Sequence, residues 1–490
     1  MTDCCKTNHN CASEPAQKLP ADPGHLGIIG GGSAAFAATT RAAERGWRVT
    51  IINDGLPIGG TCVNVGCVPS KSLIRAAETH YRNKHHPFDG IKSRSEVADF
   101  GALTRQTHAL VETLRQEKYL DVVKDLPEVK IIEGRAKFLS PQEVEVAGET
   151  LIADRVIIAT GARTHVPEIP GLAEIDYLIT DTAFELAAAP KSLLVLGGRY
   201  IALECAQMFA RLGVKTTVLQ RSDRILPTES AELTDALTGY LCGEGLNIQT
   251  GVNVLSVRPG GEGVEIEASI EGKRQIFTAE RVLLATGRTP NTDGLNLKAA
   301  GVALDHNGFI EVDAHQQTST PGIYGAGDVV GDPMFVYTAA YEGALAAENA
   351  CAVSGSNPRE RDYNPLPWVV FTDPQVAGVG MDLQQAKATG HDAETITLPM
   401  SKVPRALAAR DTRGFLQLIR DRRTDRILGA RVLAHEGSEL MMEISLALRH
   451  EMTAGELASM FHPYLTLSEA VKLAALSFGK DVDKLSCCAT

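Results

Sequence analysis

The chain has 490 residues, 44% of them hydrophobic, and a net charge of −12; its length predicts two to four domains, and its acidity argues against nucleic-acid binding. No segment approaches the ~18 uninterrupted apolar residues of a membrane span, and the first residues lack the apolar core of a secretory signal. We therefore expect a soluble cytoplasmic protein, and the 45 glycines favour an α/β fold with many tight turns.

Residues 1–23 are polar and show no periodicity, so we expect a flexible tail. This tail contains Cys4, Cys5 and Cys11. In a reducing compartment, clustered cysteines indicate redox chemistry or soft-metal binding. Two interpretations of the tail stay open, a rudimentary metal relay and an inert extension.

An apolar strand at 26–29 runs into a glycine-rich turn, and a helical stretch and a second strand at 48–52 follow. The same order recurs from 192 to 219, so the sequence contains an internal duplication. Both copies have the pattern of a dinucleotide-binding βαβ unit, whose small residues permit a tight turn, let phosphate approach the backbone, and let helix and strand pack closely. These positions hold Gly30, Gly32 and Ala35 in the first copy, and Gly197, Arg199 and Ala202 in the second.

Arg199 departs from this pattern because it stands where the second glycine belongs, so its side chain must contact the phosphates or point away from them. A later strand of each copy ends in the same Ala-Thr-Gly tripeptide, with Thr160 and Gly161 in the first copy and Gly287, followed by Arg288, in the second. Two such turns with matching tripeptides are far more specific than one glycine motif alone. We therefore predict an α/β chain that binds two dinucleotides.

The end of the second strand of each copy bears on which dinucleotide it binds, because an acid there usually binds the ribose 2′-OH of NAD. In the second copy Gln220 occupies this place and Arg221 and Arg224 follow, which favours the 2′-phosphate of NADPH over two ordinary surface arginines. In the first copy Asn53 and then Asp54 stand there, and either side chain could bind the ribose.

The segment 59–71 reads Gly-Gly-Thr-Cys-Val-Asn-Val-Gly-Cys-Val-Pro-Ser-Lys and places Cys62 and Cys67 five residues apart. In a regular helix the axial rise between them, ~7.5 Å, exceeds the ~7 Å over which a disulfide can form. We therefore predict a distorted segment, for which Gly66 is suited. A helix N-terminus would lower a thiol pKa, so redox-active cysteines are favoured over two ordinary buried ones.

This segment resembles the active-site signature of the pyridine nucleotide-disulfide oxidoreductases, and the resemblance extends from about residue 25 to the end of the sequence. It implies FAD in the first copy and NADPH in the second. It also implies a Cys62–Cys67 disulfide, with Cys67 against the flavin and Cys62 as the exchanging thiol. Residues from about 357 resemble the dimerisation domain of the family, which implies a homodimer.

The same resemblance assigns further residues to the flavin site. Gly60 and Thr61 of the signature would contact FAD, and Asp328 of Tyr-Gly-Ala-Gly-Asp would contact the ribityl chain. Lys71 would pair with Glu204 near the flavin.

The expected architecture is α/β, with two Rossmann-like domains and a C-terminal α+β dimerisation domain. The expected segments are the tail 1–23, the FAD-binding parts 24–168 and 286–356, the NADPH-binding domain 169–285, the dimerisation domain 357–482, and the Cys-Cys tail 483–490.

Two features bear on the substrate. Reduction of a disulfide needs a general acid for the leaving thiolate, usually histidine. In the stretch that corresponds to His-Pro-Thr-Leu-Ser-Glu of dihydrolipoamide dehydrogenases, Tyr464 replaces this histidine. A tyrosine with a pKa near ~10 is a poor proton shuttle at neutral pH. His462 lies close by in the sequence, so a displaced base stays open as an alternative, and we favour the interpretation that His462 is not the base. The adjacent Cys487 and Cys488 form a disulfide only with strain, so they suit a soft cation; oxidation-prone surface thiols are the alternative.

The sequence resembles the mercuric reductases in these two features, in residues 403–406 and in the dipeptide Lys118-Tyr119. This implies that the C-terminal cysteine pair of the partner subunit captures thiolate-bound Hg(II) and passes it to the Cys62–Cys67 pair. Tyr119 and Tyr464 would line the inner site. The Gly-Met-Thr-Cys-x-x-Cys motif of many mercuric reductases is not found in the sequence, so we expect a form without that metal-binding domain.

Two other functions remain open from the sequence. One is an NADPH-dependent disulfide reductase with an unusual base. The other is a protein that sequesters soft metals without turnover, and the two nucleotide-binding copies argue against it.

Overall fold

The computed structural model describes residues 24–481, apart from 262 and 354, together with Lys484. The terminal cysteines of the sequence therefore lie outside the described residues. The chain forms two compact units, each assembled from three segments of the chain. Unit 1 comprises the chain up to Gly60, 117–161 and 290–361, and unit 2 comprises 61–116, 162–289 and the chain from Asp362 onwards.

Unit 1 is built on a five-stranded parallel sheet with the order β17-β7-β1-β2-β3. Its central strands are nearly continuous apolar runs, as expected for a parallel sheet that is covered on both faces. The strands are β1 (His25–Ile29), β2 (Arg48–Asn53), β3 (Val129–Glu133), β7 (Arg155–Ile158) and β17 (Ile323–Gly325).

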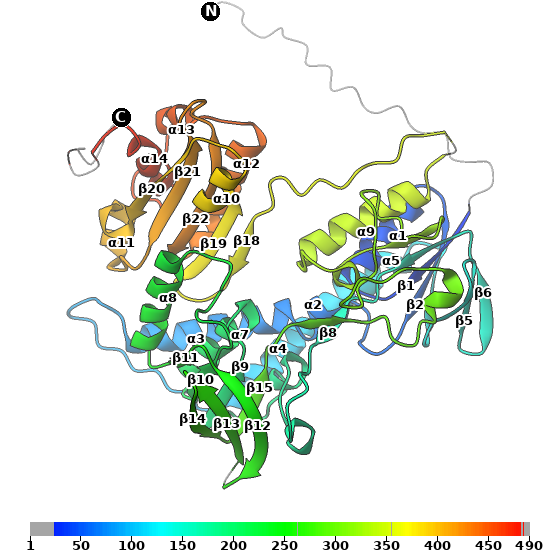
Figure 1. The fold of residues 1–490 in the computed structure, drawn as a ribbon, viewed down its shortest axis with the longest axis horizontal. Helices are drawn as coiled ribbons and strands as arrows, with labels where there is room; N and C mark the ends of the chain where they lie inside the picture. Colours follow the sequence, from blue (N-terminus) through cyan, green and yellow to red (C-terminus); the bar gives the residue numbers. More distant parts are fainter. Residues whose placement is uncertain (1–23, 262, 354, 482–483, 485–490) are drawn as a thin grey trace, which may run out of the picture. The chain divides into compact units, whose positions relative to one another are not determined.

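Helices α1 (Ser33–Ala43) and α9 (Val336–Ala350) lie side by side against this sheet (Figure 1). Their close approach requires Gly343, because a Cβ there would lie 2.0 Å from the carbonyl oxygen of Ala34. The predicted strand, turn, helix and strand of the first copy are confirmed. The other elements of unit 1 are a three-stranded antiparallel sheet of β4 (Lys137–Ser140), β5 (Glu143–Val146) and β6 (Glu149–Ile152), α5 (Asp121–Lys124), η3 (Leu297–Ala300) and η4 (Asp328–Val330).

Unit 2 contains the second copy as a four-stranded parallel sheet with the order β11-β10-β9-β15. This arrangement confirms the predicted duplication. The elements of this sheet and its helices are β9 (Ser192–Leu196), α7 (Tyr200–Arg211), β10 (Lys215–Leu219), α8 (Ala231–Gly243), β11 (Asn247–Gln249) and β15 (Arg281–Leu284).

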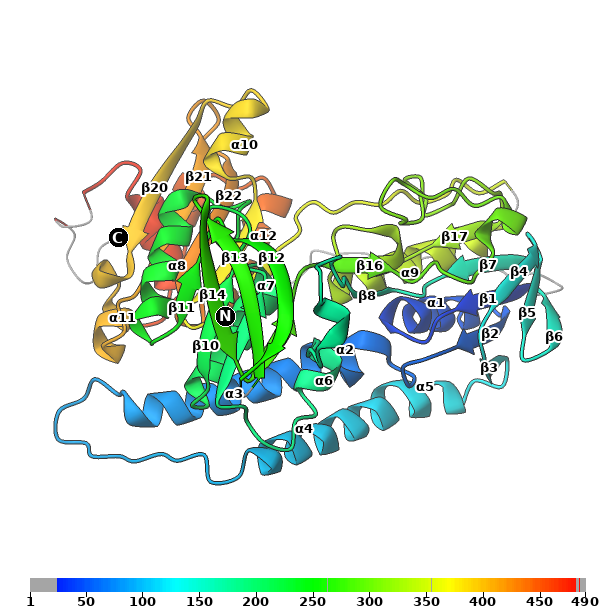
Figure 2. The same ribbon diagram turned by 60° about the horizontal axis from the view of Figure 1, so that its bottom comes forward.

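Two long helices, α3 (Cys67–Lys84) and α4 (Phe100–Arg115), run side by side in unit 2, and α3 also packs on α7 (Figure 2). Asp99 caps the N-terminus of α4 by accepting the N–H of Ala102. The smaller elements of this part are α2 (Gly60–Asn64), β8 (Ala162–Thr164), η2 (Leu172–Glu174), α6 (Thr180–Ala183), β12 (Asn253–Gly260), β13 (Gly263–Ile270), β14 (Lys273–Ala279) and β16 (Arg288–Pro290). The π-helix η1 (Gln116–Leu120) follows α4, and all of its residues but Gln116 belong to unit 1.

The C-terminal part of unit 2 is a five-stranded antiparallel sheet, with the order β18-β19-β22-β21-β20, that buries its apolar side chains against helices. Its elements are β18 (Trp368–Val370), β19 (Gln375–Gly380), α10 (Leu383–Ala388), β20 (Ala393–Pro399), η5 (Met400–Lys402), α11 (Pro404–Ala409), β21 (Phe415–Asp421), β22 (Ile427–Ala434), η6 (Gly437–Leu440), α12 (Met441–Arg449), α13 (Ala454–Ser459) and α14 (Glu469–Leu476).

The α/β class predicted from the sequence is therefore confirmed, and the domain boundaries given above remain a prediction. In the part of the chain that the structure describes, no helix combines the length and the apolar character needed to cross a membrane.

Candidate functional site

The two glycine-rich turns have the same geometry. Gly30 has φ +124° and Gly197 has φ +121°, in the region that favours glycine. A Cβ on Gly30 would lie 2.2 Å from the carbonyl oxygen of Ala159, and a Cβ on Gly197 would lie 2.2 Å from that of Ala285. Because these alanines open the two Ala-Thr-Gly tripeptides, each tripeptide packs directly against the glycine turn of its own copy.

The turn of the first copy packs closely against Gly60, with backbone against backbone. Gly60 has φ +60°, and a Cβ there would lie 2.7 Å from the Cα of Gly32. Gly32 begins α1 without a side-chain cap, and Ala35 is fully buried. A bare helix N-terminus behind a glycine turn suits a pyrophosphate, so these residues fit a dinucleotide such as FAD.

Further predicted flavin-site residues lie at the same edge of the unit 1 sheet, where β1, β7 and β17 end. The Thr160 hydroxyl donates to the carbonyl of Asn291 at 2.8 Å, and Asn291 donates back to the Thr160 carbonyl at 2.9 Å. Gly161 follows with φ +68°. Asp328 begins η4 just after Gly327, whose N–H donates to the Glu342 carboxylate at 2.7 Å. The structure thus brings the turn, Thr160, Gly161 and Asp328 to one edge.

The corresponding edge of the second copy has a different charge. Gln220 packs against the glycine turn and its amide donates to the Arg224 carbonyl at 3.2 Å. Arg221 and Arg199 are exposed, and Ala202 is fully buried in α7. Gly287 has φ +118°, and the Arg288 guanidinium donates to the carbonyl of Ala162.

The helix that carries the two cysteines is interrupted between them, as predicted. Helix α2 ends at Asn64 and α3 begins at Cys67. Gly66 occupies the break, and a Cβ there would lie 2.9 Å from the carbonyl oxygen of Thr61. The break places the Cys67 thiol at the N-terminus of a long helix, where a thiolate is stabilised.

The two thiols interact and are polarised in opposite directions. A hydrogen bond from Cys62, together with the positive charge of Lys71, lowers the pKa of Cys67 to about 7 despite its burial. The same hydrogen bond, and then burial, raise the pKa of Cys62. These opposite shifts favour the thiolate on Cys67 and the protonated thiol on Cys62.

Lys71 lies one helical turn after Cys67 and pairs with Glu204 of α7. The Lys71 ammonium is 2.6 Å from the Glu204 carboxylate, which is buried and also accepts the N–H of Phe371 at 2.9 Å. The ammonium lies 4.7 Å from the centre of the Phe371 ring. Burial alone would lower the pKa of Lys71, but the Glu204 charge outweighs it and raises this pKa, so the ammonium persists.

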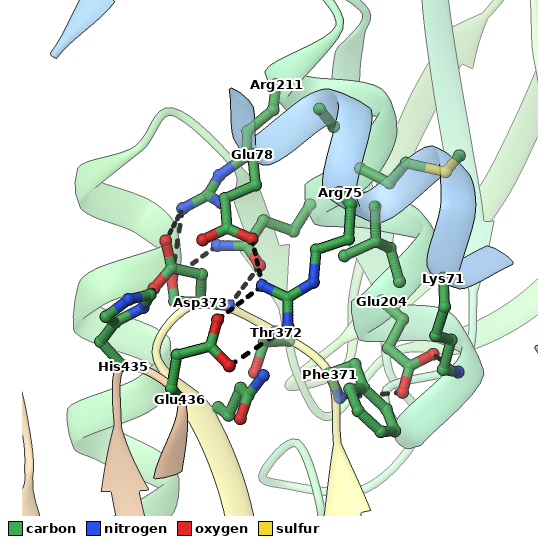
Figure 3. Close-up of a pocket in the computed structure, with 15 residues that line it drawn as sticks. Lys71, Arg75, Glu78, Glu204, Arg211, Phe371, Thr372, Asp373, His435 and Glu436 are labelled. Atoms are coloured by element: carbon green, nitrogen blue, oxygen red, sulfur yellow. Dashed lines mark hydrogen bonds and ion pairs between the residues drawn. The ribbon is translucent and has the colours of Figure 1, made fainter. Parts of the chain in front are cut away.

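A dense group of charged side chains continues from this pair along α3 (Figure 3). Arg75 is 2.6 Å from Glu436 and 2.7 Å from Glu78, and the buried Arg211 is 3.0 Å from Asp373. The hollow among these groups measures about 20 Å³, room for about one water. His435 and the surrounding carboxylates have spacings that could hold a metal ion, but arginines already pair with these carboxylates. We interpret this group as a network of ion pairs that stabilises the packing of α3 against α7 and against the loop before β19.

Tyr119 lies in the π-helix η1 and faces α1. Its hydroxyl is 3.4 Å from the Ser33 hydroxyl, and its ring meets the Phe36 ring edge-on, with ring centres 4.9 Å apart. Together with Val336 and Tyr337 of α9 these side chains line an open hollow of about 410 Å³. Sequence reasoning missed this hollow, although Ser33, Phe36, Ala37 and Thr40 have the spacing of one helix face.

The side chain of His462, the alternative candidate for the base, is buried within unit 2. Its ring is 4% exposed, Nε2 lies 2.5 Å from the Glu443 carboxylate, and Nδ1 lies 3.3 Å from the carbonyl of Met460. Both ring nitrogens therefore already have partners. Tyr464, by contrast, is 49% exposed. A carboxylate partner can also orient a catalytic histidine, so the expectation that His462 is not the base remains a prediction.

Comparison with known proteins places this geometry in a family. The model for the pyridine nucleotide-disulphide oxidoreductases matches residues 24–343, and the model for the dimerisation domain of the same family matches 366–475. A mercuric reductase from Staphylococcus aureus is 42% identical over 462 residues, which cover 94% of this chain and 84% of the relative. A mercuric reductase from Streptomyces lividans is 41% identical over 478 residues, covering 96% of this chain and 100% of the relative.

Solved structures agree with this assignment. The HOCl-induced flavoprotein disulfide reductase RclA from Escherichia coli superposes with a TM-score of 0.83 at 29% identity, covering 93% of this chain and 100% of that one. The chain therefore belongs to the pyridine nucleotide-disulphide oxidoreductase family and is an oxidoreductase that uses FAD and a pyridine nucleotide.

Proposed function

We propose that the protein reduces Hg(II), presented as a thiolate complex, to Hg(0) at the expense of NADPH. The observation that carries this proposal is the hydrogen-bonded pair Cys62 and Cys67, at the N-terminus of α3 and one helical turn before the Lys71–Glu204 ion pair. The chain that contains it is 42% identical, over 94% of its length, to a mercuric reductase. Two adjacent thiols suit a soft, two-coordinate cation. The overall reaction converts Hg(II) and NADPH to Hg(0), NADP⁺ and a proton.

In this proposal FAD, when bound in unit 1, supplies the two-electron relay between NADPH and the cysteines. Cys62 and Cys67 take Hg(II) from its two thiolate ligands; the proton that Cys62 gives up passes to one released thiolate, and the other takes a proton from solvent. Lys71 stabilises the Cys67 thiolate, and Glu204 keeps the ammonium in place. Since Hg(II) accepts the electron pair and no disulfide substrate is cleaved, no leaving thiolate of such a substrate needs a histidine acid, which is consistent with Tyr464.

The finer assignments belong to the same proposal. The protein would act as a homodimer in the cytoplasm, a compartment in which thiols stay reduced. The C-terminal cysteine pair of the partner subunit would deliver Hg(II). Tyr119 and Tyr464 would line the inner site. Gly30, Gly32, Ala35, Gly60, Thr61, Thr160, Gly161 and Asp328 would hold FAD, and Gly197, Ala202, Gly287 and Arg288 would contact NADPH.

The preference for NADPH over NADH should depend on Arg221 and Arg224. We expect the double variant Arg221→Ala/Arg224→Ala to raise KM for NADPH about tenfold, because the two guanidinium groups would pair with the 2′-phosphate and a solvent-exposed ion pair contributes about 1 kcal/mol or less. KM for NADH should hardly change, since NADH lacks this phosphate. Steady-state kinetics with both nucleotides measure the two constants, and an equal rise for both would contradict the assignment.

The decisive experiment follows NADPH oxidation by the full chain with Hg(II) and excess small thiol, beside oxidised glutathione and lipoamide. We expect oxidation that depends on mercury, and we expect the Cys487→Ala/Cys488→Ala variant to lower it about tenfold for thiol-chelated Hg(II), because transfer by thiolate exchange is lost. Oxidation that depends on a disulfide instead would identify a disulfide reductase. Mercury binding without NADPH oxidation would identify a sequestering protein.

A further inference from the structure

The second strand of the first copy ends in an amide where an acid is usual. Asn53 is buried, and its Nδ2 donates to the Leu56 carbonyl at 3.0 Å and to the Glu133 carboxylate at 3.2 Å. Its Oδ1 is packed against Gly31, because a Cβ on that glycine would lie 2.3 Å from it. Asn53 therefore holds the turn and the glutamate in place and brings no negative charge of its own.

The missing charge lies on the neighbouring strand. Glu133 is the last residue of β3 and the direct register partner of Asn53 in the parallel pair. Its side chain is exposed at the edge where the strands end, and the Asn53 amide fixes its carboxylate there. A carboxylate offers about four acceptor positions, so hydrogen bonds from Asn53 leave others for a ligand.

Asp54 is the other acid near this place, but it differs in how it is held. It follows the end of β2 and is exposed. Among the described residues, none forms a hydrogen bond or ion pair with the Asp54 carboxylate. Glu133 is thus the acid whose carboxylate is already fixed at the strand ends.

The second copy shows what changes when no ribose acid is needed. Gln220 packs on Gly198 as Asn53 packs on Gly31, and its amide binds the turn at Arg224. The neighbouring strand β11 ends at Gln249, and Thr250 follows, so no carboxylate stands in the place of Glu133. The two copies therefore share the amide and differ in charge, with Glu133 in the first.

We propose that Glu133, positioned by Asn53, supplies the carboxylate that accepts the adenosine ribose hydroxyls of FAD, in place of the acid that ordinarily ends β2. The inference rests on the proposed placement of FAD in the first copy and is independent of the metal that the enzyme reduces. It assigns Asn53 a positioning role and Asp54 no contact with the ribose.

The test measures flavin affinity rather than turnover. The full-length protein is freed of flavin, and FAD rebinding is titrated by flavin fluorescence in the parent, Glu133→Gln and the matched control Asp54→Asn. We expect Glu133→Gln to raise the FAD dissociation constant about tenfold or more, because it loses hydrogen bonds to a charged acceptor while keeping the bond from Asn53. Asp54→Asn should leave the constant unchanged.

FMN provides the second readout because it lacks the adenosine. Glu133→Gln should bind FMN as the parent does, whereas a merely structural defect would weaken FMN and FAD alike. An unchanged FAD constant in Glu133→Gln, a loss in Asp54→Asn alone, or an equal loss of both flavins would overturn the proposal. Since no mercury is present, these outcomes are separate from failure of the proposed reaction.

Discussion

Replacement of Cys67 by serine is expected to lower mercury-dependent NADPH oxidation about a thousandfold or more. A serine hydroxyl does not ionise near neutral pH, so it cannot replace the thiolate whose pKa the Cys62 hydrogen bond and Lys71 lower to about 7. It can neither form a disulfide nor bind a soft cation, and loss of such a nucleophile removes most of the rate. Cys62→Ser should have the same consequence for turnover, because both sulfurs are needed.

The matched control is Cys242→Ser. Cys242 is exposed on α8 and belongs to neither cysteine pair, so its variant should turn over at the parent rate. Steady-state NADPH oxidation with thiol-chelated Hg(II) measures all three variants, after FAD content has been matched. Retention of a tenth of the parent rate by Cys67→Ser would show that the proposed redox pair is not the site of reduction.

Features that depend on a short stretch of chain could be predicted from the sequence. The glycine-rich turns at Gly30 and Gly197 predict a strand, a turn and a helix in that order. Glycine is needed at both positions because a side chain would be strained at the positive φ and would collide with a neighbouring carbonyl oxygen. The break at Gly66 follows from the rise of a helix between two cysteines that must meet. Each of these predictions needs only local geometry, and the structure confirms each of them.

Features that depend on packing between distant segments could not be predicted in this way. Two contacts join segments that are far apart in the chain. They are the cation–π contact of Lys71 with Phe371 and the ion pair between Arg211 and Asp373. Glu133 could be identified as a candidate ribose ligand only from its register with Asn53, because a glutamate at the end of a strand does not by itself indicate a binding site. Sequence motifs thus identify the reactive residues, and tertiary contacts determine which side chains position them and set their electrostatic environment.

Lys71→Met is expected to raise the pKa of Cys67 above about 7 and to slow turnover at neutral pH on the order of a hundredfold. The variant removes the cation that lowers this pKa and leaves the Glu204 carboxylate, which raises it, without its partner. The thiolate is the reactive form and is lost as the pH falls through the pKa, so a higher pKa moves the acid limb of the pH–rate profile upward. Raising the pH should therefore restore much of the lost rate.

The double variant Lys71→Met/Glu204→Gln separates charge from packing. It removes the repulsive carboxylate as well as the ammonium, so the acid limb should return part of the way toward that of the parent. Lys84→Met, at the exposed end of the same helix, is the matched control and should leave the profile unchanged. Ultraviolet titration of the thiolate in the reduced protein gives the pKa independently of turnover. If Lys71→Met slows the enzyme while neither the titration nor the acid limb moves, Lys71 acts through packing of α3 and not through the charge of Cys67.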